Sequence, residues 1–225
     1  HDALPIYGTD LYLYNRMEPS IWGANEEFIS CPQLDDLQCA YTSLQGFLKG
    51  ANKQSINVFA CFDNEEVGSG TKQGAGSTFL YDAMRRINNA LGKGEEEYYR
   101  ALASSFMLSA DNAHAVHPNH PAKTDVNNCV YMNEGIVVKS HAGQKYTSDA
   151  VSIAVFKGLC KKAGVPVQFF SNRSDTAGGS TLGNIAMAQV SMNSVDIGLP
   201  QLAMHSSYET AGVKDTAYMI KVMED

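Results

Sequence analysis

The densest group of reactive side chains lies in the run CFDNEEVGS, residues 61–69. The apolar, β-rich stretch 56–62 precedes the two glutamates and is typical of a buried strand, and glycine-rich sequence follows them. Open α/β sheets build their sites at such strand ends. Glu65 and Glu66 would repel each other unless a cation lies close by. The pair therefore suggests a divalent metal, with one glutamate as ligand and the other for proton transfer; a solvated acidic turn is the alternative.

Three further ionisable residues, Asp35, Asp111 and His205, fall at predicted helix starts or strand ends. Asp35 and Asp36 open a predicted helix, where acidic side chains also commonly complement the helix dipole. Oxygen ligands with one imidazole suit Zn²⁺, or a harder ion such as Mn²⁺ or Co²⁺. One aspartate bridging two metals about 3.5–4 Å apart is the arrangement of two-metal hydrolases.

Two other motifs carry less weight. His114, His117 and His120 follow one another at three-residue steps, but Pro118 prevents the helix that would align them on a zinc ion. The glycine-rich stretch after Glu66 misses the dinucleotide-binding spacing by one residue and lacks the lysine of a phosphate-binding loop. We therefore expect neither a three-histidine zinc site nor a nucleotide site.

Alternating strands and helices would position these groups and indicate a three-layer α/β domain. Leu37, Tyr41, Leu44 and Leu48 recur at helical spacing, and Gly50 ends that helix. The Gly178–Gly179 turn before another helix suits an anion site and a plain tight turn about equally. The predicted strands are 10–14, 28–30, 56–62, 107–110, 136–139, 167–170 and 194–197. The predicted helices end near residues 49, 91, 106, 163 and 223, and Ser148 is the expected cap of the fourth.

Composition narrows the class of protein. The 225 residues are 44% hydrophobic and 18% charged, which fits one globular domain with a sizeable core. A net charge of −7 and the lack of any basic run argue against a nucleic-acid partner. No apolar stretch approaches the ~20 residues of a membrane span. Five cysteines without CxxC spacing are typical of free thiols in a reducing compartment, so we expect a cytoplasmic protein.

Six motifs in order along the chain resemble the aspartyl aminopeptidases, from about Asp10 to the C-terminus. These motifs are QLDDL, DNEEVGS, SADNAHAVHPNH, KSHAGQKY, SDTAGGSTLG and MHSSYE. The resemblance implies a cytosolic, oligomeric, two-zinc peptidase that removes N-terminal Asp or Glu from peptides. It also implies a three-layer αβα domain of the zinc-peptidase type with a mixed central sheet, and a cis peptide bond between Asp35 and Asp36.

Site roles follow from the same resemblance. Asp35 would bridge two Zn²⁺ ions, with Mn²⁺ or Co²⁺ as alternatives, Glu66 and His205 would share one ion, and Asp111 would bind the other. Glu65 would be the general base that takes the proton of the attacking water and passes it to the leaving amine. The expected substrate contacts are His114, Lys139, Tyr146 and Met204, whereas His117 and His120 would be structural.

The chain departs from the family pattern at its beginning. In the family a further metal-binding histidine lies upstream, before an inserted oligomerisation and lid domain. We therefore expect residues 7–30 to be the remnant of that domain with its return strand, and residues 31–225 the distal part of the catalytic domain, with upstream strands missing. Residues 1–6, HDALPI, match what a common sequencing-adapter DNA encodes and are expected to be non-native. The fragment would then be inactive alone. A non-catalytic assembly subunit, and a two-metal aminopeptidase of other specificity, are the alternatives.

Overall fold

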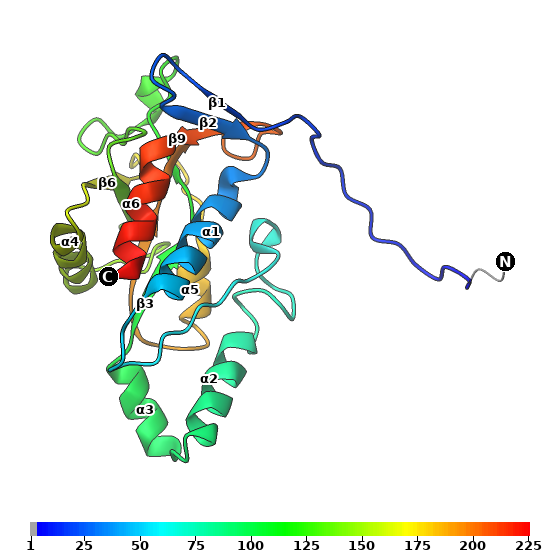
Figure 1. The fold of residues 1–225 in the computed structure, drawn as a ribbon, viewed down its shortest axis with the longest axis vertical. Coiled ribbons are helices and arrows are strands. Elements are labelled where there is room, and N and C mark those ends of the chain that lie inside the picture. The colour runs from blue at the N-terminus through cyan, green and yellow to red at the C-terminus, as the bar shows by residue number, and fades with distance from the viewer. Residues whose placement is uncertain (1–3) are drawn as a thin grey trace.

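The structure, a computed structural model, describes residues 4–225. Its body is a layered α/β domain (Figure 1). The strands are β1 Ser20–Trp22, β2 Phe28–Cys31, β3 Phe106–Ala110, β4 Ala113–His114, β5 Ile136–Ser140, β6 Val167–Ser171, β7 Asn193–Gly198, β8 Pro200–Leu202 and β9 Glu209–Gly212. The α-helices are α1 Leu34–Lys49, α2 Phe79–Ala90, α3 Glu95–Ala103, α4 Ala150–Ala163, α5 Leu182–Ala186 and α6 Val213–Glu224. Two short 3₁₀ helices are η1 Glu65–Val67 and η2 Pro121–Lys123.

The central sheet has the order β3-β7-β5-β6 and is mixed, because β5 runs antiparallel to β7 while the outer pairs are parallel. Side chains alternate across it: Val195 and Ile197 of β7 face the main core, and Asp196 faces the other way. Helices α1, α4 and α6 contribute Cys39, Phe156 and Met219 to that core, and α5 packs on the opposite face. The predicted three-layer αβα architecture with a mixed sheet is confirmed.

A second sheet was not predicted. Its order is β1-β2-β9-β8-β4, and it joins the segment after residue 19 to the C-terminal third of the chain. All five of its strands have four residues or fewer. Segments this short show no clear alternation of apolar and polar side chains, so their local sequence does not reveal the pairing. This sheet matters for the site, because β8 and β9 flank the loop that carries His205.

Two predicted strands are wrong. Residues 10–14 lie in an extended arm that runs away from the body (Figure 1), and Leu13 is fully exposed. Residues 56–62 are also irregular, with Ile56 61% and Val58 46% exposed. Both segments have the apolar pattern of strands, but a strand forms only beside a hydrogen-bonding neighbour, and residues 4–225 provide none for either segment. A smaller correction concerns α4: Asp149, not Ser148, caps it by accepting the N–H of Ser152.

Helix α1 also differs from expectation. Its apolar stripe, Leu37, Tyr41, Leu44 and Leu48, faces solvent, with 36–66% exposure. The opposite face is buried instead, and there Gly46 lies against α6. All five cysteines are free thiols, as predicted. Within residues 4–225 no helix is long and apolar enough to span a membrane. Residues 1–3, part of the segment predicted to be non-native, lie outside the described residues.

Candidate metal centre

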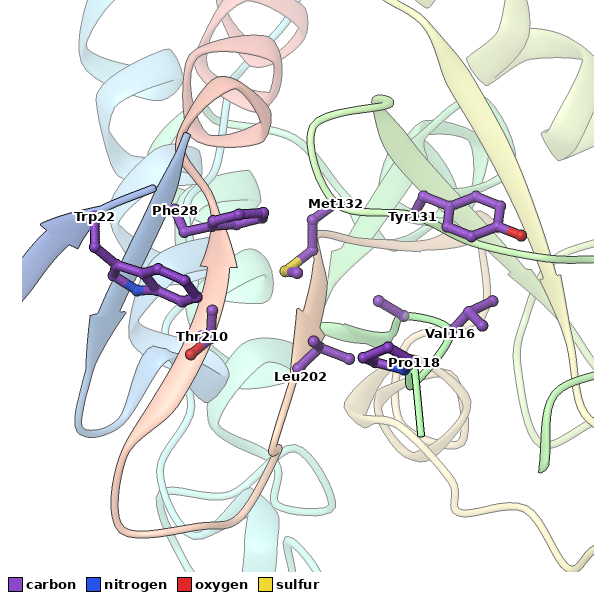
Figure 2. A pocket seen from close by; sticks show the side chains of 9 residues that line it. Trp22, Phe28, Val116, Pro118, Tyr131, Met132, Leu202 and Thr210 are labelled. Atoms are coloured by element: carbon purple, nitrogen blue, oxygen red, sulfur yellow. The ribbon is translucent and has the colours of Figure 1, made fainter. Parts of the chain in front are cut away.

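A polar cavity of about 400 Å³ brings together nine predicted site residues from six separate parts of the chain. They are Asp35, Glu65, Glu66, Asp111, His114, Lys139, Tyr146, Met204 and His205. A second cavity of about 440 Å³, shown in Figure 2, is lined mostly by apolar side chains such as Trp22, Phe28 and Met132. Because Tyr131 is its only ionisable lining residue among those described, the polar cavity is the candidate site.

Asp35 enters the cavity from the first turn of α1, where the backbone is not helical. Asp35 has φ −84° and ψ 112°, and its peptide bond to Asp36 is cis, which confirms that prediction. The Asp35 side chain is only 5% exposed. Its N–H donates to the carboxylate of Glu209, 2.8 Å away. The Asp35 side chain therefore lines the site instead of serving as a plain helix-start charge.

Glu65 and Glu66 occupy η1, between two residues with left-handed backbone, Asn64 (φ 61°) and Gly68 (φ 98°). The loop after them is compact: a Cβ on Gly74 would lie 2.3 Å from the backbone oxygen of Ser69, so only glycine fits there. This tight turn directs both glutamates toward the cavity. The Oε2 of Glu66 lies 3.1 Å from the Nε2 of His205.

His205 completes a cluster with Asp35 and Glu66. Its Nε2 lies 3.3 Å from the Oδ2 of Asp35, and the ligand atoms of all three residues lie within 4.8 Å of one another. The backbone of His205 is left-handed, with φ 66°, and its N–H donates to Glu209 at 2.7 Å. Three of the four metal ligands inferred from the sequence are thus assembled without any rearrangement.

Asp111 follows β3 and forms a second cluster with Asp35 and Asp36, again within 4.8 Å. The Oδ2 of Asp111 accepts a hydrogen bond from the Nζ of Lys139 at 3.1 Å. Lys139 also donates to the backbone oxygen of Asn112 and lies over the ring of Tyr146. Asp111 therefore lies between the carboxylates of α1 and the one buried lysine of the site.

Asp36 is the residue that sequence reasoning missed. Its Oδ1 is buried and has no hydrogen-bond partner among the described residues. The adjacent acidic pair was visible in the sequence, but a regular helix would have turned Asp36 away from Asp35. Conversely, His114, His117 and His120 all line the cavity, yet none belongs to a candidate metal cluster within residues 4–225.

The electrostatics of the cavity show an excess of negative charge. Burial, followed by repulsion from Asp111 and Glu66, raises the pKa of Asp35 to about 9. Burial, with repulsion from Asp111 next, raises the pKa of Glu65 to about 7. Burial, followed by repulsion from Lys139 and His205, lowers the pKa of His114. A divalent cation would neutralise the crowded carboxylates, and a donor set of carboxylates with one imidazole fits a zinc-type ion.

Comparisons with known proteins show a family match over the described residues. The family described as aminopeptidase I zinc metalloprotease (M18) matches residues 4–225. A probable M18 family aminopeptidase 2 of Clostridium novyi is 48% identical over 224 residues, which cover 100% of this chain and 52% of that protein. The chain thus spans about half the length of the curated relatives it matches.

Solved structures show the same fold. An M18 aminopeptidase of Thermotoga maritima superposes with a TM-score of 0.84 at 27% identity, covering 94% of this chain and 49% of that one. The S. cerevisiae mApe1 dodecamer gives a TM-score of 0.82 at 27% identity, covering 94% of this chain and 48% of that one.

Proposed function

Because this chain belongs to the aminopeptidase I zinc metalloprotease (M18) family, we propose that it supplies the general base and four metal ligands of an enzyme that removes N-terminal Asp and Glu from peptides. One observation carries the proposal: the side chains of Asp35, Glu66, Asp111 and His205 converge on one cavity that also contains Glu65. These residues come from distant parts of the sequence, and a solvated acidic turn would not require them to meet.

The metal roles are assigned by donor chemistry and position. Asp35 belongs to both clusters, so we assign it to two ions, with Glu66 and His205 on one and Asp111 on the other. Zinc is the family metal, and Mn²⁺ and Co²⁺ suit the same oxygen-rich donors. Two bound ions would supply Lewis acidity that lowers the pKa of a water molecule and polarises the scissile carbonyl.

Glu65 is the residue we assign to proton transfer. It lines the cavity beside Glu66 but belongs to neither metal cluster, which leaves its carboxylate available. In the metal-free chain, burial, with repulsion from Asp111 next, raises the pKa of Glu65 to about 7; two bound cations would lower the pKa and favour the carboxylate form that a base requires. Glu65 would accept the proton of the attacking water and deliver it to the departing amine, so the carboxylate is regenerated in each turnover.

The proposal includes selectivity for peptides that begin with Asp or Glu. Lys139, Lys123 and Arg173 all line the cavity and can attract the side-chain carboxylate of an N-terminal Asp or Glu. His114, Tyr146 and Met204 would complete the substrate pocket. Lys139 is the main candidate because it is the cation closest to a proposed metal ligand.

The proposal extends to the organisation of the whole protein. We infer that residues 31–225 are the distal part of the catalytic domain and that residues 7–30 end an inserted oligomerisation domain. The half-length match to relatives supports a further upstream segment. The dodecameric mApe1 supports a homo-oligomer. Five free thiols are consistent with a cytoplasmic location.

The test is hydrolysis of Asp-, Leu- and Ala-anilides by this chain joined to the upstream half that its relatives possess. We expect preference for the Asp substrate, and loss of about 10²- to 10⁴-fold in kcat for Glu65→Gln with metal content unchanged, because only the proton acceptor is removed. Preference for Leu or Ala would indicate another two-metal aminopeptidase. A zinc-loaded protein that hydrolyses none of the three would indicate an assembly subunit.

A further inference from the structure

Glu209 is a buried carboxylate that none of the roles above uses. It begins β9 and is 2% exposed. Within residues 4–225 no lysine, arginine or histidine side chain forms an ion pair with it. A buried carboxylate without a cation needs strong hydrogen-bond donors, because desolvation otherwise disfavours the charge. The identity of those donors therefore indicates what the residue does.

Both oxygens of Glu209 accept main-chain N–H groups of proposed metal ligands. Oε2 accepts the N–H of Asp35 at 2.8 Å, and Oε1 accepts the N–H of His205 at 2.7 Å. Asp35 and Glu209 are separated by 174 positions in the chain, so this carboxylate joins the beginning of α1 to the loop after β8. Hydrogen bonds to a charged acceptor are among the stronger and shorter ones in proteins.

Both backbones need such support. His205 has φ 66°, a left-handed conformation that side-chain-bearing residues adopt at a cost. Asp35 lies in the first turn of α1, where an N–H has no acceptor within the helix, so Glu209 supplies a partner that the helix does not. With these N–H groups fixed by one rigid carboxylate, the Asp35 Oδ2 and the His205 Nε2 lie 3.3 Å apart and face the same space.

We propose that Glu209 is a positioning residue that fixes the Asp35 and His205 backbones so that both side chains are presented to one metal ion. The inference rests on the proposed function, since it takes these two residues as ligands. It differs from a purely structural role in one respect. A carboxylate that only stabilises the second sheet would affect folding stability, whereas a positioning carboxylate controls the affinity and the ligand geometry of the metal.

The structure offers a matched control in Asp215. This carboxylate is also fully buried, and it also accepts two main-chain N–H groups, those of Asn133 and Gly135. It does not line the polar cavity. Glu209→Gln and Asp215→Asn are therefore parallel changes: each keeps the side-chain shape and leaves a single acceptor oxygen for two N–H donors. Burial raises the pKa of Asp215 to about 7, so the comparison is made above that pH, where Asp215 is ionised and its substitution removes a charge.

The experiment uses the protein of the hydrolysis test, this chain joined to the upstream half that its relatives possess. It titrates Co²⁺ into the metal-free protein and records the visible absorption of the bound ion, with thermal unfolding of the metal-free proteins measured in parallel. We expect Glu209→Gln to weaken Co²⁺ binding by about 10–100-fold and to alter the absorption bands. Asp215→Asn should lower the unfolding temperature of the metal-free protein by a comparable amount but leave both the affinity and the spectrum unchanged.

Each other outcome has a defined meaning. Equal affinity for Glu209→Gln and the unaltered chain, or an equal loss in both variants, would overturn the positioning role and leave the metal site intact. No Co²⁺ binding by the unaltered chain would refute the proposed metal site and this inference with it. If Glu209→Gln does not fold, Glu209→Asp keeps both acceptor oxygens but withdraws them by one methylene. It should bind Co²⁺ more weakly, and unchanged binding would contradict the proposal.

Discussion

Lys139 is the residue to which we assign the proposed specificity for acidic substrates, and it also balances the charge of Asp111. Burial by itself would lower the pKa of its ammonium, but Asp111, Asp196 and Tyr146 raise the pKa above its ordinary value. The Lys139–Asp111 pair is 3% and 14% exposed, so few solvent molecules screen it. If Asp111 binds a metal ion, the negative charge of Asp111 is neutralised mainly by that ion and less by Lys139. The ammonium can then interact with the carboxylate of an acidic substrate.

Replacing Lys139 by Met should therefore lower kcat/KM for Asp-anilide by about 10–100-fold more than for Ala-anilide, as expected from loss of a hydrogen bond between charged groups. The measurement is the Asp-to-Ala ratio of kcat/KM in the protein that includes the upstream half. Met keeps the length of the aliphatic chain, so the packing against Tyr146 is largely preserved.

Lys145 supplies the control for this change. It is an exposed lysine near the same cavity, and its Nζ donates to the backbone oxygen of Gly178. Lys145→Met should leave the Asp-to-Ala ratio unchanged. An equal fall of kcat/KM for both substrates in Lys139→Met would show that Lys139 serves only to compensate Asp111.

At the scale of elements, the packing of α1 on α6 orients the start of α1, where Asp35 lies. The two helices can approach closely because residue 46 is a glycine: a Cβ at this position would lie 2.1 Å from the Cβ of Met223. The Met223 side chain could not rotate away from such a Cβ, because its own Cβ is fixed to the α6 backbone. The two helices would have to move apart.

Gly46→Ala should therefore destabilise the protein by about 1–3 kcal/mol, although alanine normally favours a helix interior over glycine. Gly158→Ala in α4 is the matched control, since a Cβ at that position meets nothing within 4 Å. There the same substitution should stabilise by about 0.5–1 kcal/mol. Urea unfolding of both variants measures the two effects, and a gain of stability for Gly46→Ala would refute the close α1–α6 contact.

For the whole molecule, the exposed apolar face of α1 and the unpaired segment 56–62 are the features that matter. Leu37, Tyr41 and Leu48 are each more than half exposed, as is Ile56. Contiguous exposed apolar surface usually marks a surface that another segment covers. We proposed an upstream segment on the basis of the relatives' length, and it would also provide the partner that residues 56–62 lack.

The isolated chain should consequently bind about one metal ion tightly and hydrolyse Asp-anilide negligibly. The cluster of Asp35, Glu66 and His205 offers three ligands including a nitrogen, whereas the cluster of Asp111 offers only carboxylates. Loss of even a supporting group around a metal typically costs 10–100-fold in affinity or activity, and loss of a direct ligand costs at least as much.

Metal analysis after dialysis, together with an Asp-anilide assay with and without the upstream half, checks both expectations. Addition of the upstream half should raise the content to two ions and restore turnover. Two tightly bound ions and turnover from the 225 residues alone would show that the second ion needs no upstream ligand.

The sequence by itself determined the elements whose local pattern is strong. Strands β3, β5, β6 and β7 and helices α4 and α6 were predicted within one to three residues, because each combines an apolar run with clear end signals. The ordered motifs also identified the residues that line the cavity, since the chemistry of a site restricts its residue types more strongly than the fold does.

Only the tertiary structure decided the rest. The patterns of 10–14 and 56–62 indicate strands, but a strand depends on a partner that local sequence does not reveal. The second sheet, the orientation of Asp36 and the two hydrogen bonds of Glu209 all arise from segments that are far apart in the chain. Propensity and periodicity act over a few residues, whereas these features depend on backbone groups that meet only after the chain has folded.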